Sequence, residues 1–293
     1  MKAAAVSYTR PSQLTEVLQL LAQHGDEARL LAGGQTLLAT LNMRLSEPAL
    51  LIDLQSVAAL KGLSVTGDVL RIGALVTHTE IENSALIAQR APLLAAAAPH
   101  IAHRAIRNLG TFGGSIAYGD PAAEWPACLL AMNGIVLARS INGTRRIPAD
   151  NFFTGLYTTA LAADEIIEAC EIPLAPEGDP AQRFSFTELA RRHGDYAVVG
   201  LAATASVKGE QIEHIRLAWI GVGCAPLRAT ACENALRGQT LTPQVIAQAI
   251  STLRAELSPL ADLTHSEAAK KQLAGVLLQR ALQSWMTPAA ATA

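Results

Sequence analysis

The chain has 293 residues, 50% of them hydrophobic, which is enough to bury a sizeable core and is consistent with two domains. A formal net charge of −2 gives no basic footprint for nucleic acid, and an aromatic content of 4% argues against a base-stacking platform or a sugar-binding groove. The segment MKAAAVSYTRPSQ has too short an apolar run for a signal peptide, and no stretch is long enough to span a bilayer, so we expect a cytoplasmic protein.

The first elements expected along the chain are a helix, a strand and a second helix. A segment that opens with Pro-Ser and has leucines at helical spacing predicts a helix over 11–25, and an apolar strand follows over 28–32. The pattern is helical again over 36–45. The glycine pair between this strand and this helix, Gly33-Gly34, therefore lies at a helix N-terminus, where the helix dipole favours a phosphate group.

The segments up to residue 172 predict an α+β region. Its expected elements are an apolar strand over 50–54, a hairpin of 63–65 and 69–72, a mostly helical segment over 77–103, a helix over 121–132, and strands over 135–138 and 165–172.

Residues 173–182, PLAPEGDPAQ, contain three prolines and one glycine and are the best domain boundary in the chain. After it we expect an antiparallel sheet of three strands (183–189, 198–207 and 212–222) and three helices (near 226–237, 243–256 and 266–286). The expected division is a first domain over 1–175, with subdomains of about 1–58 and 59–175, a second domain over 176–286, and a disordered tail over 287–293.

Two glycine pairs are the most informative feature of the sequence: Gly33-Gly34 in LLAGGQT and Gly113-Gly114 in GTFGGSIAYGDPA. Backbone N–H groups can converge on an anion where no Cβ stands in the way. A Gln-Thr dipeptide follows the first pair, and Thr111 and Ser115 flank the second, so both segments carry donors that a bare turn does not require. Two such loops suggest a diphosphate held from both sides, and a tight turn is the alternative interpretation of each pair.

The sequence contains no G-x-G-x-x-G, no P-loop and no G-x-S-x-G motif, so a diphosphate would be bound in a non-Rossmann way and a serine hydrolase is disfavoured. Cysteines at 128, 170, 224 and 232 are too far apart for a zinc or iron–sulfur ligand set, and the seven histidines are scattered. We therefore expect no metal site and no catalytic dyad or triad in this chain.

Three ordered motifs resemble the FAD-binding medium subunit of molybdenum hydroxylases, a family that includes the medium subunit of aerobic carbon monoxide dehydrogenase and its relatives in quinoline and nicotine-type dehydrogenases. The motifs are AGGQTLL at 32–38, IRNLGTFGGSIAYGDPAAEWPA at 106–127 and RRHGDYAVVG at 191–200. The resemblance spans nearly the whole chain. It implies an α+β fold with a two-part FAD-binding domain of the PCMH/vanillyl-alcohol-oxidase-like type, followed by a three-stranded antiparallel sheet with a helical bundle.

The resemblance also implies a set of FAD-binding residues. The diphosphate would be cradled by the two glycine loops, which comprise Leu31, Ala32, Gly33, Gly34, Gln35, Thr36 and Leu37 in the first and Thr111, Gly113, Gly114 and Ser115 in the second.

Other positions are implied for the remaining parts of FAD. Glu124 matches an acid that contacts the ribityl chain, with Asp120 as the competitor, and either residue could instead be a helix-capping acid. Ile166 or Ile167 would lie against the adenine, although both also fit an ordinary strand core. Tyr196 would lie near the isoalloxazine, in a loop whose alternative is a solvated charged turn.

In the family that the chain resembles, FAD accepts electrons one at a time and passes them to an external acceptor. The resemblance implies a small partner subunit with two [2Fe-2S] clusters, a large partner subunit with a molybdenum cofactor that oxidises the substrate, and a dimer of heterotrimers. Two alternatives are a self-sufficient FAD-dependent oxidase or reductase and a scaffold module whose glycine loops are only turns. The sequence leaves open the substrate (carbon monoxide, an N-heteroaromatic or an aldehyde) and the acceptor.

Overall fold

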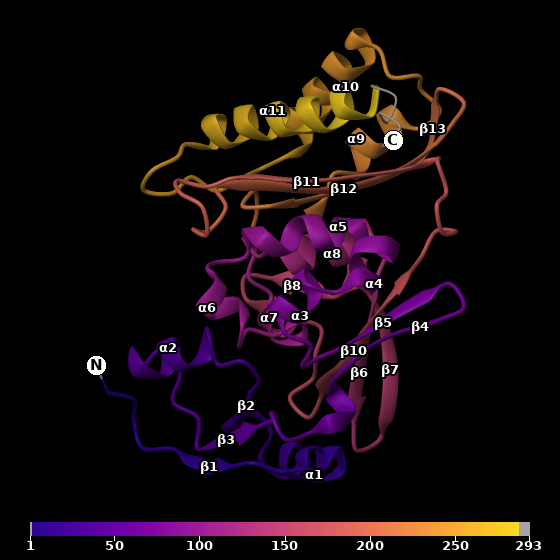
Figure 1. Ribbon diagram of the computed structural model, residues 1–293. Helices are drawn as coiled ribbons and strands as arrows, with labels where there is room; N and C mark the ends of the chain where they lie inside the picture. Colours follow the sequence, from indigo (N-terminus) through magenta and orange to yellow (C-terminus); the bar gives the residue numbers. More distant parts are fainter. Residues whose placement is uncertain (1, 287–293) are drawn as a thin grey trace.

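A small parallel sheet forms the N-terminal part of the protein, whose computed structural model describes residues 2–286. Its strand order is β1-β3-β2, and the apolar face of α1 packs against it through Val17, Leu18 and Leu21. The elements are β1 (Ser7–Thr9), α1 (Leu14–His24), β2 (Ala28–Leu31), α2 (Leu37–Asn42) and β3 (Leu50–Asp53) (Figure 1).

A second, antiparallel sheet of five strands has the order β4-β5-β10-β6-β7. Its strands are β4 (Leu63–Thr66), β5 (Val69–Gly73), β6 (Ile135–Ser140), β7 (Gly143–Pro148) and β10 (Ile166–Pro173). A separate hairpin, β8 (Phe153–Gly155) with β9 (Thr158–Thr159), follows β7.

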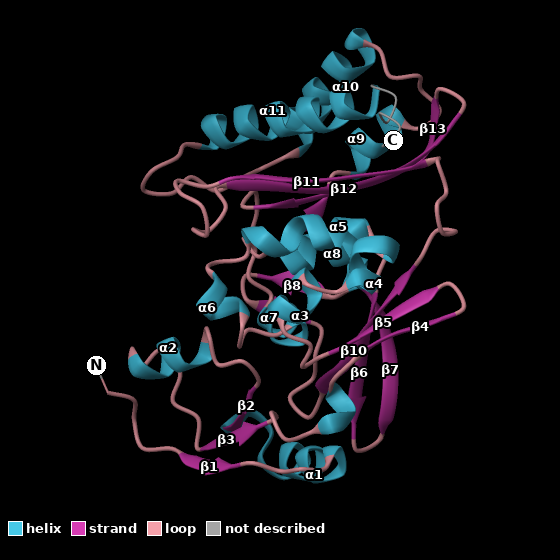
Figure 2. Ribbon diagram, in the orientation of Figure 1, coloured by secondary structure: helices cyan, strands magenta, loops and turns pink. Residues whose placement is uncertain are grey.

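Six short helices form a layer between the five-stranded sheet and the C-terminal sheet (Figure 2). They are α3 (His78–Glu82), α4 (Ala85–Arg90), α5 (Pro92–Ala97), α6 (Arg104–Arg107), α7 (Phe112–Tyr118) and α8 (Glu124–Ala131). Trp125 and Phe112 are fully buried in this layer and are among its largest core side chains.

The C-terminal part consists of an antiparallel sheet that carries its own three helices on one face and packs its other face on the helical layer (Figure 1). Its elements are β11 (Gln182–Leu189), β12 (Val199–Lys208), β13 (Gln211–Ile220), β14 (Leu227–Arg228), α9 (Thr230–Leu236), α10 (Pro243–Glu256) and α11 (Glu267–Met286). Because side chains alternate along a strand, Leu201 and Trp219 pack toward the C-terminal helices, whereas Phe186 and Ile220 join the core of α5 and α8. The three predicted strands are confirmed, and the two-residue β14 adds to their edge.

Several predicted boundaries differ from the structure for local reasons. The helix expected over 36–45 ends at Asn42, because Arg44 has a positive φ of 57°. The helix expected from residue 121 begins at Glu124, because an Asp120 Oδ1 acceptor holds the Ala122 amide at 2.8 Å in a turn. The second glycine pair lies inside the first turn of α7 rather than in a loop. The predicted tail over 287–293 falls outside the described residues.

Candidate functional site

A cleft of about 1000 Å³ lies between the N-terminal sheet, the helical layer and the loop before β12, which is a volume typical of small-molecule and cofactor sites. Every predicted site residue except Leu31 lines this cleft. The Leu31 side chain lies beneath the first glycine loop, 3.2 Å from the position that a Cβ on Gly34 would take. The predicted residues that line the cleft are Ala32, Gly33, Gly34, Gln35, Thr36, Leu37, Thr111, Gly113, Gly114, Ser115, Asp120, Glu124, Ile166, Ile167 and Tyr196.

The first glycine loop lines the cleft, and its backbone amides are not used in hydrogen bonds within the described residues. Among the described residues, none accepts a hydrogen bond from the N–H groups of 33–36. The Gln35 side-chain Nε2 donates to the Gly33 carbonyl oxygen at 3.0 Å, and Gly34 has a φ of 72°, a region that favours glycine. A Cβ on Gly33 would lie 2.1 Å from the Leu109 carbonyl oxygen. The glycines therefore permit both the close approach of two segments and a row of unused amides, an arrangement that suits an anion.

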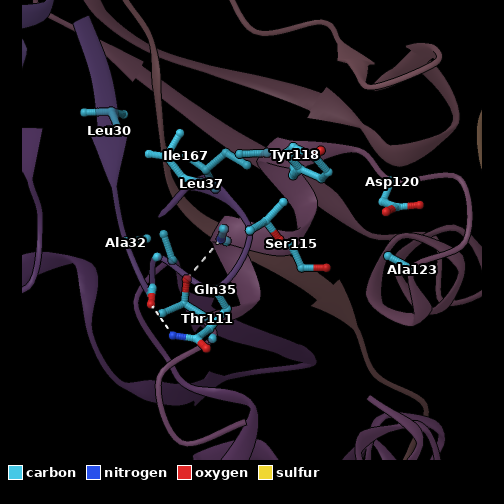
Figure 3. A pocket seen from close by; sticks show the side chains of 18 of the residues that line it. Leu30, Ala32, Gln35, Leu37, Thr111, Ser115, Tyr118, Asp120, Ala123 and Ile167 are labelled. Carbon is cyan, nitrogen blue, oxygen red and sulfur yellow. Dashed lines mark hydrogen bonds between the residues drawn. The ribbon is translucent and has the colours of Figure 1, made fainter. Parts of the chain in front are cut away.

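The second glycine pair contributes differently. The amides of Gly113, Gly114 and Ser115 donate to the Ala74 carbonyl oxygen at 2.9 Å, the Thr111 Oγ1 at 3.1 Å and the Thr111 carbonyl oxygen at 3.1 Å. The expectation that both pairs present free amides is wrong for this pair, because the N-cap of α7 and the contact with Ala74 use them. The segment instead offers the hydroxyls of Thr111 and Ser115, which Figure 3 shows in the cleft.

The two candidate acids are both buried at the cleft wall, 8% exposed for Asp120 and 9% for Glu124. Neither caps α8, whose N-cap is Ala123 without a side-chain hydrogen bond. Burial raises the pKa of Asp120. Burial, and next the negative charge of Glu188, raise the pKa of Glu124 to about 8, so this carboxyl holds its proton at neutral pH. The capping interpretation of Glu124 and Asp120 is therefore wrong.

The two isoleucines proposed for the adenine end face different cores. The register of β10 against β6 shifts between Ile167 and Ala169, where the strand bulges. Ile166 packs with the N-terminal core and Ile167 with the core of the helical layer, and both line the cleft. Both isoleucines are thus strand-core residues and cleft-lining residues at the same time. The structure does not distinguish which of the two would lie against the adenine.

The loop before β12 closes one end of the cleft. A Cβ on Gly194, whose φ is 78°, would lie 2.7 Å from the Ala102 carbonyl oxygen, so the loop packs closely on the helical layer. Asp195 holds the loop by ion pairs of 3.2 Å with Arg191 and 3.7 Å with Arg192. Tyr196 lines the cleft at its rim and is 68% exposed. The loop is therefore a solvated charged turn, as the alternative interpretation had it, and also forms part of the cleft wall.

Two of the cleft-wall residues that sequence reasoning missed are Tyr157 and His78. Tyr157 lies in the turn of the β8–β9 hairpin with a φ of 51°, and its ring centroid is 5.0 Å from that of Tyr118. His78 is buried, and its Nδ1 accepts a 2.9 Å hydrogen bond from the Trp125 indole. Burial lowers the pKa of His78 to about 4, so its imidazole is neutral. Tyr157 was missed because nothing in the sequence marks a tyrosine that adopts a positive φ. His78 was missed because no motif distinguishes it from the other histidines.

Two family models match the chain. The FAD binding domain in molybdopterin dehydrogenase matches residues 4–175, and the CO dehydrogenase flavoprotein C-terminal domain matches residues 184–285. The chain therefore belongs to the family of FAD-binding medium subunits of molybdopterin dehydrogenases, which are oxidoreductases.

Individual relatives match over almost their full length. The nicotine 6-hydroxylase medium subunit of Paenarthrobacter nicotinovorans is 40% identical, covering 96% of this chain and 98% of that protein. Carbon monoxide dehydrogenase from Hydrogenophaga pseudoflava superposes with a TM-score of 0.94 at 34% identity, over 98% of this chain and 99% of that chain. Quinoline 2-oxidoreductase from Pseudomonas putida 86 gives a TM-score of 0.91 at 36% identity, over 98% of this chain and 100% of that chain.

A membrane-spanning helix would need both sufficient length and an apolar composition. No helix within residues 2–286 meets both conditions.

Proposed function

We propose that this chain is the flavin subunit of a heteromeric molybdenum hydroxylase. In this proposal FAD takes electrons from two [2Fe-2S] clusters of a small partner subunit and passes them to an external acceptor, while a large partner subunit oxidises the substrate at its molybdenum cofactor. The observation that carries the proposal is the cleft itself, in which the free amides of the first glycine loop and the hydroxyls of Thr111 and Ser115 line the same space. Membership of the medium-subunit family supports it.

The cleft residues fit FAD in a specific way. The amides of 33–36 would bind the diphosphate, with the N-terminal end of α2 and the Thr111 and Ser115 hydroxyls beside them. Glu124 would lie against the ribityl chain, Ile166 or Ile167 against the adenine, and Tyr196 near the isoalloxazine. When bound, FAD supplies the chemistry that joins one-electron donors to one- or two-electron acceptors, and this chain binds and orients it.

Further parts of the proposal concern organisation. We propose a first domain over 1–175 and a second over 176–286, and assembly as a dimer of heterotrimers. We also propose that the complex works in the cytoplasm, which the four free cysteines support because unpaired thiols are typical of a reducing compartment.

The test of cofactor binding is reconstitution of the purified full chain with FAD, followed by flavin absorption after gel filtration. Wild type should retain FAD, whereas Gly33→Ala should lose it, because the added Cβ would meet the Leu109 carbonyl oxygen. Gly67→Asn is the matched control, since a Cβ there meets no atom within 4 Å and asparagine tolerates its φ of 57°. A wild-type chain that retains no flavin would overturn the proposal.

The test of the electron route is co-purification of the native complex. We expect two further subunits, molybdenum and iron with the chain, and flavin reduction by substrate only when all subunits are present. Substrate turnover by the FAD-loaded chain alone would instead favour the self-sufficient oxidase or reductase.

A further inference from the structure

We propose that Arg107 is a positioning residue of the cofactor cleft. Its side chain fixes the turn formed by residues 99–103, and this turn determines where the loop before β12 lies at the end of the cleft. The inference rests on the proposed function, because that loop bears Tyr196, which we place near the isoalloxazine. Arg107 is not one of the residues that line the cleft, so it acts through the turn and the loop.

The Arg107 guanidinium is buried at the end of α6, where 9% of the side chain is exposed. Its Nε and Nη2 donate to the two carboxylate oxygens of Glu82, the last residue of α3, at 2.9 and 3.2 Å. A buried charge is costly unless a partner compensates it, and a bidentate carboxylate also fixes the plane of the guanidinium. This ion pair leaves the third nitrogen, Nη1, for the turn.

The turn depends on Nη1 for its hydrogen bonds. Nη1 donates to the carbonyl oxygens of Ile101 at 3.0 Å, Ala102 at 3.1 Å and Pro99 at 3.4 Å. No backbone N–H of residues 2–286 donates to the carbonyl oxygens of Ile101 and Ala102. A carbonyl group that is removed from water without a donor destabilises the fold, so Arg107 supplies the donor that the backbone lacks.

The backbone of the turn is strained at Ala102, whose φ is 44°. Alanine disfavours this left-handed region because its Cβ crowds the neighbouring carbonyl oxygen. Such a conformation persists only where the surroundings determine it, and here Arg107 binds the carbonyl groups of Ala102 and of the residue before it. The turn also forms part of the cleft wall, through Ile101, Ala102 and His103.

The loop before β12 meets the turn at the same carbonyl group. A Cβ on Gly194 would lie 2.7 Å from the Ala102 carbonyl oxygen and 3.0 Å from its carbonyl carbon. This close approach places Arg192, Asp195 and Tyr196 of the loop in the cleft wall. The position of the Ala102 carbonyl group, which the guanidinium holds, therefore decides how near the loop comes to the bound cofactor.

The first experiment measures the loop in the full chain without FAD, by limited digestion with trypsin and mass spectrometry. Arg191 and Arg192 are cleavage sites within the loop, with side chains 66% and 83% exposed, and Lys208 at the end of β12 is 81% exposed and serves as the internal reference. Arg107→Lys keeps the charge but has one nitrogen for all these acceptors. It should raise loop cleavage relative to Lys208 cleavage at least about fivefold.

A matched control separates this effect from a general loss of stability. Arg216 also binds a backbone carbonyl oxygen, that of Leu130 at 2.9 Å, and pairs with Asp150 at 2.8 Å, but it lies on β13 opposite the middle of β12. Arg216→Lys should leave the ratio of loop to Lys208 cleavage unchanged. An equal rise at both sites in Arg107→Lys would show a merely structural arginine and would contradict the proposal.

A rescue tests the strained turn. Glycine adopts a positive φ without the penalty that alanine has, so the turn of an Ala102→Gly variant needs less support from Arg107. Adding Ala102→Gly to Arg107→Lys should lower the relative loop cleavage at least about threefold. A double variant that is cut as fast as Arg107→Lys would contradict the role of the turn.

The second experiment titrates the full chain with FAD. Arg107→Lys and Gly194→Ala should each weaken FAD binding at least about tenfold, because each displaces the loop. The double variant should bind no more weakly than the weaker single variant, since both changes act on one contact. If wild type binds FAD and neither variant weakens it, the positioning role is wrong while the proposed function stands. If wild type binds no FAD, the proposed function fails, and the trypsin ratio still decides whether Arg107 positions the loop.

Discussion

The Trp125 indole donates a 2.9 Å hydrogen bond to Nδ1 of His78, and both side chains are buried. The bond places the imidazole proton on Nε2 and fixes the wall of the cleft beneath the second glycine motif, since a Cβ on Gly110 would lie 2.6 Å from that Nε2. Replacement of His78 by leucine should lower the free energy of unfolding by about 1–3 kcal/mol, because the buried indole N–H would lose its acceptor. Urea denaturation checks this, and Trp125→Phe combined with His78→Leu should cost less than the two separate changes together.

The same histidine makes stability depend on pH. The pKa of His78 is lowered from 6.5 to about 4 in the folded chain, chiefly by burial, so the unfolded chain binds more protons between these values. Stability from this group is therefore present above pH 6.5 and lost as the pH falls toward 4. At about 1.36 kcal/mol per pKa unit, the loss relative to His78→Asn should reach about 3 kcal/mol. A difference between the two proteins that does not vary with pH would contradict the neutral imidazole.

Glu124 gives stability the opposite dependence on pH. Its folded pKa is raised from 4.5 to about 8 by burial and by the charges of Glu188 and Asp120, so the folded chain binds more protons between these values. In the chain without FAD, stability from this group is present below pH 4.5 and lost as the pH rises through 8. Relative to wild type, Glu124→Gln should become more stable by up to about 5 kcal/mol across this window, measured by urea denaturation.

Gly113 should tolerate no side chain. A Cβ there would lie 2.5 Å from the Ala74 Cβ, and the Gly113 amide donates to the Ala74 carbonyl oxygen at 2.9 Å. Gly113→Ala should push α7 away from the end of β5, lower the free energy of unfolding by about 1–3 kcal/mol and abolish FAD retention. Gel filtration with flavin detection checks the retention, and full retention by Gly113→Ala would contradict the close packing.

Thr111 should act through its hydroxyl. It caps α7 by accepting from the Gly114 amide, and its hydrogen remains available to a ligand in the cleft. Thr111→Val should cost about 1 kcal/mol of stability and weaken FAD binding, whereas Thr111→Ser should preserve both. Titration of the unloaded chain with FAD checks this, with equal affinity for both variants as the contradicting result.

The sequence predicted the parts of the fold that have a strong pattern. Helical leucine spacing predicted α1, and alternating apolar runs predicted β11, β12 and β13. The strand β7, with the sequence GTRRIP, was missed because it is almost wholly exposed and polar. The hairpin β8–β9 was missed because so short a pair leaves no period to detect.

The candidate site was predictable where a motif names its residues and not where tertiary contacts decide. The glycine pairs identified the cleft, but the loss of the Gly113 and Gly114 amides to Ala74 and Thr111 follows from packing that no local pattern encodes. Likewise, the pKa of Glu124 is raised in part by the negative charge of Glu188, a residue of β11 that lies far along the sequence.

The wall of the cleft that bears the first glycine loop belongs to a core of its own, centred on α1 and the parallel sheet and joined to the other elements through Leu75 and Ile166. The opposite walls share one continuous core, since Phe186, Ala202 and Ile220 pack with the helical layer. Displacement of the N-terminal sheet would therefore leave that continuous core intact, whereas widening the cleft on the opposite side would divide it. We expect the dinucleotide to enter and leave the cleft on the side of the N-terminal sheet, while the opposite walls stay in place.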